Sequence, residues 1–322
     1  TVVPAGGAYI VMNSCLVNDL NGNANGQGDF GETVTLNVVA ENVGTENANG
    51  VSATLTSSDP FITITDNSYA YGDIPAGSTI IGENAFEITI AENVPDNYTA
   101  MLEIQFTDAS KPLWVSSMTL VLHAPIIELN NFTIIDNNGN SNGKIDPGET
   151  VNIILEIANN GSSDGYNILG QLSSFDPYIT IIEGSQAYGD IAAGETLENT
   201  FSVTASESTP AGHPATLVLA LTGDLSLNAN ASFDVIIGQI PVLIIDLDGN
   251  LNSGSQMMAA IANNDITAEY TTSLPEDLSL YSSIFLCLGI YADNHVLSSA
   301  EGQALAGFLN NGGNLYMEGG DT

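Results

Sequence analysis

The chain has 322 residues, 43% of them hydrophobic, which is enough to build the cores of two or three domains. Its charge is extreme, because 38 Asp and Glu stand against 2 Lys and Arg, a formal net charge of −36. A surface this acidic repels nucleic acid and anionic membranes, so neither is expected as a partner. No apolar run reaches the length of a transmembrane helix.

Residues 1–124 are predicted to form an all-β domain. The first strand runs from Tyr9 to Val17, and Val34, Leu36 and Val38 alternate with polar residues in the next one. Further short strands are expected at 51–56, 61–65, 85–90, 101–106 and 114–122. Seven short strands separated by turn residues are typical of an immunoglobulin-like sandwich, here without the Cys–Trp–Cys pattern of antibody domains.

The loop between the first two strands is rich in oxygen-bearing side chains. Counted from Asn21, its spacing is that of a calcium loop, with Gly26 at the sharp turn, Asp29 at the ninth position and Glu32 at the twelfth. The alternative is an Asn/Gly-rich turn that holds no metal. In a second register the loop begins at Asp19. A backbone carbonyl near Gln27 is expected to complete the shell. The predicted calcium ligands are Asp19, Asn21, Asn23, Asn25, Gln27, Asp29 and Glu32.

The same loop recurs later in the chain. Adding 117 to each number carries Asp19 to Asp136 and Glu32 to Glu149, and the offset persists through 59–64 and 71–74, which become 176–181 and 188–191. The chain therefore contains a duplicated domain, and residues 125–238 are predicted to repeat the first sandwich. The second set of predicted ligands is Asp136, Asn138, Asn140, Asn142, Lys144, Asp146 and Glu149.

The position of each loop predicts the kind of calcium site. Glu32 and Glu149 lead directly into strands, so no helix leaves the loop and a fixed structural ion is favoured over a calcium sensor. Because the asparagines are neutral, each loop offers only three carboxylates, which predicts weak binding, with a dissociation constant of about 10⁻⁴ M or higher.

Residues 239–322 change period and predict a small α/β domain. Continuous apolar runs at 242–245 and 283–288 are typical of buried parallel strands, and 268–272 and 314–317 are expected to be two more. Segments 255–263 and 299–309 have helical patterns, the second with Ser298 or Ser299 as its cap. The order β-α-β-β-α-β indicates an open sheet.

Other candidate chemistry lies in this last domain. Asp246 and Asp248 follow the first parallel strand, where α/β proteins bind ligands, so they suit a metal or polar ligand; the alternative is a solvated Asp-Gly turn. Cys287 with His295 as its base would make a nucleophile, but its apolar neighbours favour a core position. Cys15 and Cys287 are both expected to be buried free thiols.

Two resemblances carry further expectations. The run Asp136–Thr150, with Asp-Pro-Gly-Glu-Thr entering a strand, resembles immunoglobulin-like modules of large secreted surface proteins of Bacteroidota, including regions beside gingipain-like peptidases. Residues 241–322 resemble the front half of a class I glutamine-amidotransferase-like domain, which implies that 239–322 form a partial α/β domain of flavodoxin-like type. The run 312–320 aligns with the turn that carries the family's nucleophilic cysteine. Here Glu318 stands in the cysteine's place, and the family's histidine would lie beyond residue 322, so no amidotransferase activity is expected.

Three functions remain open from the sequence. The first is a non-enzymatic, extracellular or cell-surface structural protein that binds calcium and self-associates head to tail, as in a fibre. The second is an accessory or adhesion segment of a larger secreted peptidase or adhesin, and the third is a hydrolase site in the α/β domain. No signal peptide precedes Thr1, so the chain is either cytoplasmic or a mature or cut product, and calcium loops favour the latter. The edge at 315–317 is expected either to be completed by chain that continues past Thr322 or to be covered by another copy, with Thr1–Pro4 as one candidate segment.

Overall fold

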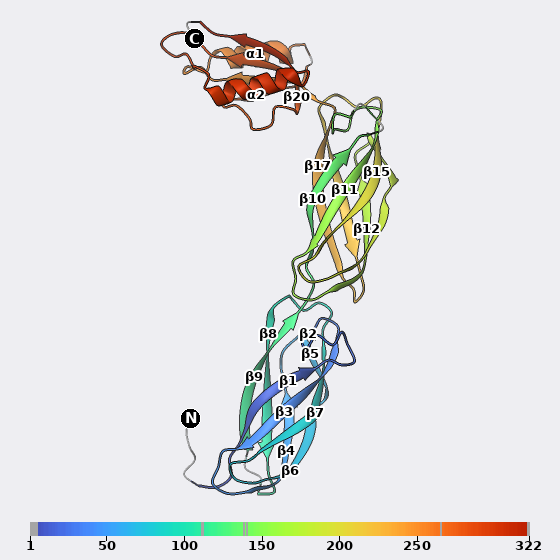
Figure 1. Ribbon diagram of the computed structural model, residues 1–322, viewed down its shortest axis with the longest axis vertical. Coiled ribbons are helices and arrows are strands. Elements are labelled where there is room, and N and C mark those ends of the chain that lie inside the picture. Colours follow the sequence, from blue (N-terminus) through green and yellow to red (C-terminus); the bar gives the residue numbers. More distant parts are fainter. Residues whose placement is uncertain (1–5, 111–112, 138, 140, 265, 321–322) are drawn as a thin grey trace.

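The computed structural model describes residues 6–110, 113–137, 139, 141–264 and 266–320. These residues form three units that follow one another along the long axis of an elongated molecule (Figure 1). The first two units consist of strands, and the third combines strands with helices. The protein is therefore mainly β, as the alternating patterns predicted.

The first unit is a sandwich of two sheets. One sheet has the order β1-β3-β7-β5, and the other has the order β2-β9-β8-β4-β6. Neighbouring strands are antiparallel except β2 and β9, which pair in parallel. The strands are β1 (Ile10–Asn18), β2 (Gly28–Asp29), β3 (Thr33–Asn42), β4 (Ala48–Thr56), β5 (Ile62–Asp66), β6 (Ser68–Ile74), β7 (Thr79–Ile90), β8 (Tyr98–Thr107) and β9 (Leu113–His123).

The second unit repeats this plan with sheets β10-β11-β15-β13 and β14-β12-β16-β17. Its strands are antiparallel throughout. They are β10 (Ile127–Ile135), β11 (Thr150–Asn159), β12 (Gly165–Ser174), β13 (Ile179–Glu183), β14 (Ser185–Ile191), β15 (Thr196–Ala205), β16 (His213–Thr222) and β17 (Asn228–Ile237). The offset of 117 maps β3 onto β11 and β6 onto β14, so the internal duplication extends to the strands themselves.

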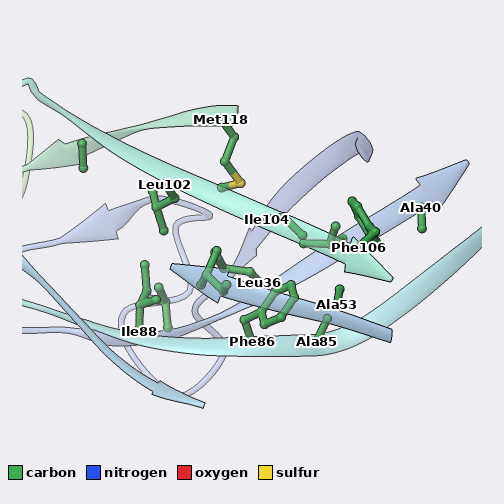
Figure 2. Close-up of a cluster of buried hydrophobic side chains, with 14 of the residues drawn as sticks. Leu36, Ala40, Ala53, Ala85, Phe86, Ile88, Leu102, Ile104, Phe106 and Met118 are labelled. Atoms are coloured by element: carbon green, nitrogen blue, oxygen red, sulfur yellow. The ribbon is translucent and has the colours of Figure 1, made fainter. Parts of the chain in front are cut away.

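The core of the first sandwich lies between its two sheets. In β3, Val34, Leu36 and Val38 are at most 1% exposed, and the residues between them face outward, as period-2 alternation requires. Figure 2 shows Leu36, Phe86 and Ile88 opposite Leu102, Ile104 and Phe106 of the facing sheet. The apolar alternation therefore fixes which face of each strand is buried.

Two buried polar contacts recur in both sandwiches. Asn42 is fully buried, and its side chain accepts hydrogen bonds from the backbone of Tyr9 and Gly44 and donates to the carbonyls of Glu46 and Ile74. Its counterpart Asn159 makes the same four kinds of bond, to Ile126, Gly161, Ser163 and Ile191. Each amide thus joins four backbone groups at one end of its sandwich.

A tyrosine hydroxyl crosses each core in the same way. The Tyr71 hydroxyl donates to the carbonyl oxygen of Val38, and the Tyr188 hydroxyl donates to that of Leu155, both over 3.0 Å. Strands β6 and β14, which carry these tyrosines, were not expected. Their Ser, Gly and Asp residues have low strand propensity, so tertiary packing decides their conformation.

The third unit is a parallel sheet with the order β19-β18-β20-β21. In the described part of this unit, α1 packs on β18 and β19, and α2 packs on β21. Ser298 caps α2 in a capping box with Glu301, which confirms the predicted cap. The elements are β18 (Ile240–Asp246), α1 (Ser253–Ala262), β19 (Ala268–Thr271), β20 (Tyr281–Cys287), α2 (Ser299–Asn310) and β21 (Asn314–Glu318).

Strand β21 is the outermost strand of this sheet. Tyr316 and Met317 are each 51% exposed, so apolar side chains lie at this edge as the sequence predicted. Segment Thr1–Pro4, proposed to cover such an edge, lies outside the described residues. No helix in the described ranges is long and apolar enough to cross a membrane.

The two cysteines differ in their surroundings, which corrects one prediction. Both are free thiols, but only Cys287 is buried. Cys15 is half-buried, because it lies in β1 beside the opening between the sheets, where Met12 and Val17 line a shallow pocket with residues of β9.

Candidate metal centre

The first loop joins β1 to β3 and is turned inward by its own side chains. Asp19 Oδ2 accepts a hydrogen bond from the backbone of Gly26 over 3.0 Å. Asn23 Oδ1 accepts from the backbone of Asn25, and Asn25 Oδ1 accepts from that of Gln27. Gly26 has a φ of +83°, which confirms the need for glycine at this turn. These contacts fold the loop back on itself.

Asp29, near the end of the same loop, is 2% exposed. Its Oδ2 accepts hydrogen bonds from the side-chain amides of Asn23 (2.7 Å) and Asn25 (2.8 Å). Its Oδ1 is buried and has no hydrogen-bond partner among the described residues. A buried carboxylate oxygen without a partner is costly unless a water or a cation satisfies it.

Glu32 closes the loop from the other side. Its Oε1 accepts from the backbone of Asn23 and its Oε2 from that of Asp29, each over 3.2 Å. Burial raises the pKa of this carboxyl, the two backbone donors lower it, and the charges of Asp29 and Asp19 raise it further, with a net increase. The three carboxylates of the loop are therefore close enough to repel one another, which a bound cation would relieve.

The second loop repeats this geometry between β10 and β11. Asp136 Oδ2 accepts from the backbone of Asn142, and the Asn142 side-chain amide donates to Asp146 Oδ2 over 2.8 Å. Glu149 Oε2 accepts from the backbone of Asp146. Gly143 has a φ of +77°, equivalent to Gly26. The predicted ligands Asn138 and Asn140 lie outside the described residues.

The remaining predicted ligands lie at the margin of the loops. The side chain of Asn21 is exposed, and Gln27 is half-buried. Lys144 extends away from its loop, and its ammonium group donates to the backbone oxygen of Ser279 in the third unit over 2.6 Å. Only the backbone carbonyls of Gln27 and Lys144 were expected to bind calcium, and these side-chain positions leave that expectation open.

The donor set suits a hard cation. Carboxylate, amide and backbone oxygens are the ligands that calcium takes in proteins. Within the described residues, no three His, Cys, Asp or Glu side chains are grouped closely enough to hold a metal by themselves. Calcium in these loops would therefore need the asparagine and backbone oxygens as well, and the buried Oδ1 of Asp29 fits such an ion.

A second group of carboxylates lies at the carboxyl edge of the parallel sheet. Asp246, Cys287 and Glu318 are the last residues of three adjacent strands and are paired in register. Asp246 Oδ2 accepts from the backbone of Gly254 at the start of α1, so this carboxylate anchors the helix. Asp248 Oδ1 accepts from the backbone of Asn250 and Leu251, as an Asp-Gly turn does. These contacts give both aspartates a structural role. Asp246 Oδ1 is buried and has no hydrogen-bond partner among the described residues, so a metal or polar ligand at this edge stays a prediction.

The geometry disfavours Cys287 as a nucleophile. Burial and the nearby charges of Asp246 and Glu318 raise the pKa of its thiol to about 12, so the thiol stays protonated at neutral pH. The Cys287 thiol contacts Met257, whereas the Nε2 atom of His295 lies 3.1 Å from Glu301.

The junction between the two sandwiches contains residues that the sequence did not point to. Asp96 Oδ1 accepts from the backbone of Ala124 (3.0 Å) and of Ser162 (3.2 Å) and from the Ser162 hydroxyl. His123 Nδ1 lies 2.6 Å from the same hydroxyl. The partners are 28 to 66 positions apart in the chain, so no local pattern marks them.

Comparisons with known proteins give the following results. No family model and no curated protein matches the chain. Among solved structures, the chain is similar to BspA_C_WT, with 11% identity over 70% of this chain and 99% of that one, and a TM-score of 0.38. It is similar to the Streptococcus agalactiae AgI/II polypeptide BspA C-terminal domain, with 12% identity over 70% and 99% of the two chains, and a TM-score of 0.36.

A third similar structure is red sea bream transglutaminase, with 11% identity over 71% of this chain and 31% of that one, and a TM-score of 0.26. At these identities and TM-scores, none of the three similarities carries an argument about what the chain does. The function is therefore argued from the site itself.

Proposed function

We propose that this chain is a non-enzymatic, extracellular structural segment whose two immunoglobulin-like sandwiches each bind one calcium ion. The observation that carries the proposal is the repeated closure of the loops. In both copies a glutamate carboxylate, Glu32 or Glu149, folds back over the loop and accepts hydrogen bonds from its backbone. The same closure in two copies supports a shared ligand.

Calcium would act on stability. Each loop concentrates three carboxylates, and the whole sequence holds only two Lys and Arg to balance its acidic residues. A divalent ion that binds the folded loop and not the unfolded chain stabilises the folded state by mass action. Its role would be to hold an acidic, elongated protein rigid where calcium is abundant, as it is outside cells.

We extend the proposal to self-association through the third unit. The resemblance to a flavodoxin-type domain is supported by the strand order of this parallel sheet. Its first strand in the chain, β18, lies between β19 and β20. Strand β21 leaves one edge of this sheet unpaired among the described strands. Exposed backbone and apolar side chains at such an edge favour strand addition by another copy. A head-to-tail contact of this kind would extend the elongated shape in Figure 1 into a fibre.

An accessory or adhesion segment of a larger secreted peptidase or adhesin is the second candidate. The same elongated arrangement of three units favours it, because stacked sandwiches also serve as spacers. The two candidates share the calcium loops and differ in whether the chain itself assembles.

Electron microscopy of the purified protein with calcium and with excess chelator tests the proposal. The structural role predicts straight rods in calcium, lengthening into fibres at high protein concentration, and bent or collapsed particles in chelator. Particles of identical shape in both conditions would contradict a structural role for calcium. Straight single rods that never lengthen would favour the spacer.

A further inference from the structure

The first calcium loop faces the second sandwich across a pocket of about 370 Å³. On the side of the first sandwich, the pocket is lined by loop residues that include Asn23, Asp29 and Glu32. On the other side it is lined by residues of the second sandwich, namely Ser163, Tyr166 and Leu225. Leu225 packs on the loop itself, because a Cβ at Gly31 would lie 2.9 Å from its side chain. The pocket therefore belongs to both sandwiches.

Each side of this pocket contributes a buried oxygen that lacks a partner. Asp29 Oδ1 comes from the first sandwich, and Ser163 Oγ comes from the second. Both residues are 2% exposed, and neither atom has a hydrogen-bond partner among the described residues. Two such oxygens in residues that line one pocket indicate a bound group that both oxygens can contact, such as a cation.

The two junctions of the molecule differ at one informative position. In the second loop, the ammonium group of Lys144 reaches across the junction to Ser279, so a positive charge already links the second sandwich to the third unit. The equivalent position in the first loop, 117 residues earlier, is the neutral Gln27. The carboxylates of the first junction have no lysine or arginine beside them in the described chain, so a cation from solution would fill the same role there.

We infer that the first calcium site is completed across the junction, with Ser163 of the second sandwich as a ligand, bound directly or through one water. This rests on the proposed function, since it concerns the same ion. Asp29, Glu32 and Asn23 hold the calcium ion from one side. Ser163 supplies an oxygen from the other, and Tyr166 lies against the Asn23 side chain. The ion thereby joins the two sandwiches.

Calorimetric titration of the 322-residue chain with calcium, after chelation, tests this inference. The substitution Glu149→Gln first weakens the second site, so that the first is measured alone. In that background, Ser163→Ala should raise the dissociation constant about tenfold, the scale on which residues supporting a metal site act. The matched control is Ser202→Ala, a buried serine of the same sandwich that bonds to the Val151 carbonyl within its own sheet. It should leave the constant within about twofold.

A second measurement does not depend on Ser163. Terbium binds calcium sites and emits when a nearby tyrosine is excited, so Tyr166→Phe in the Glu149→Gln background should remove more than half of the sensitised emission. Unchanged affinity in Ser163→Ala together with unchanged emission in Tyr166→Phe would overturn the inference while leaving the proposed function standing. A wild-type chain that takes up no calcium at all would instead contradict the proposed function.

Discussion

Glu32 lies directly over Gly22, because a Cβ built on Gly22 would stand 2.2 Å from Glu32 Oε1. Gly139 and Glu149 have the same relationship in the second sandwich, at 2.1 Å. No side chain fits at this distance, so glycine is what allows the glutamate to close each loop. Glycine is required here because a side chain would collide with the glutamate. Backbone strain is not the reason, since neither glycine has a positive φ.

We predict that Gly22→Ala weakens calcium binding by the first loop and spares the second. The added methyl group must displace the Glu32 carboxylate, which carries the closing oxygens. The loss should be about tenfold or more in affinity, by comparison with other changes in metal-supporting residues. Calorimetry should then resolve one normal and one weakened site, and Gly139→Ala should weaken the other.

The control for this pair is Gly302→Ala on α2, where the added Cβ meets no atom within 4 Å. Alanine favours a helix over glycine by about 1 kcal/mol, so this variant should melt no lower than the wild type and bind calcium normally. Normal calcium binding by Gly22→Ala as well would show that closure by Glu32 is not needed.

Chelation should lower the melting temperature of the protein. At a free calcium concentration about 100-fold above the dissociation constant, one bound ion stabilises the folded state by about 2.7 kcal/mol. Glu149→Gln should lose more of this stabilisation than Asn142→Ala, because glutamate is charged and can supply two oxygens. Thermal melts of each variant in calcium and in chelator measure the difference. Equal melts of the wild type in both solutions would contradict the prediction.

The sequence predicted the two oxygen-rich loops and most strands, because both have local patterns; calcium in the loops stays a prediction. Asp19–Glu32 and Asp136–Glu149 carry their pattern locally, and strands such as β3 show it as alternation. The sequence did not predict the buried amides of Asn42 and Asn159, because a single asparagine is equally common in turns. Their burial depends on residues that are distant in the chain. Their equivalence at the offset of 117 was a signal that could have found them.

The junction residues could not be predicted. No spacing pattern marks Asp96, Ser163 and Tyr166, because each lies where the two sandwiches meet. Ser163 is an ordinary serine in an Asn/Ser/Gly turn until the second sandwich is placed against the first loop. Residues that act between domains are fixed by packing, which local propensity does not encode.

Replacing Asn42 with alanine should destabilise the first sandwich by about 3 kcal/mol. The change leaves four backbone groups, one buried and three partly buried, without the partner that the amide provides, and each unsatisfied group is costly. Asn159→Ala should have the same effect on the second sandwich alone. Asn13→Ala, which removes an exposed side-chain contact to Glu41, should change stability by no more than about 0.5 kcal/mol. Denaturant unfolding monitors all three, and comparable stability of Asn42→Ala and Asn13→Ala would refute the assigned role.

The junction at Asp96 should weaken in acid. Burial raises the pKa of this carboxyl, but the donors on Ala124 and Ser162 outweigh burial, so its pKa falls below the ordinary 3.8. A lowered folded-state pKa stabilises the protein fully above 3.8, and this contribution is lost as the pH falls below that value. Asp96→Ala should cost about 1 kcal/mol at neutral pH, because the carboxyl is partly exposed. The difference between wild type and variant should shrink between pH 4 and pH 2, and a difference that stays constant would exclude the carboxylate as its source.

Calcium uptake by the chelated wild-type chain tests the central claim most directly. Calorimetric titration should show about two binding events. Their dissociation constants should be near 10⁻⁴ M, because many of the predicted ligands are neutral asparagines. Glu32→Gln and Glu149→Gln should each weaken one event, and the double variant should show neither. A wild-type titration without heat, together with an unchanged melt in millimolar calcium, would contradict the account.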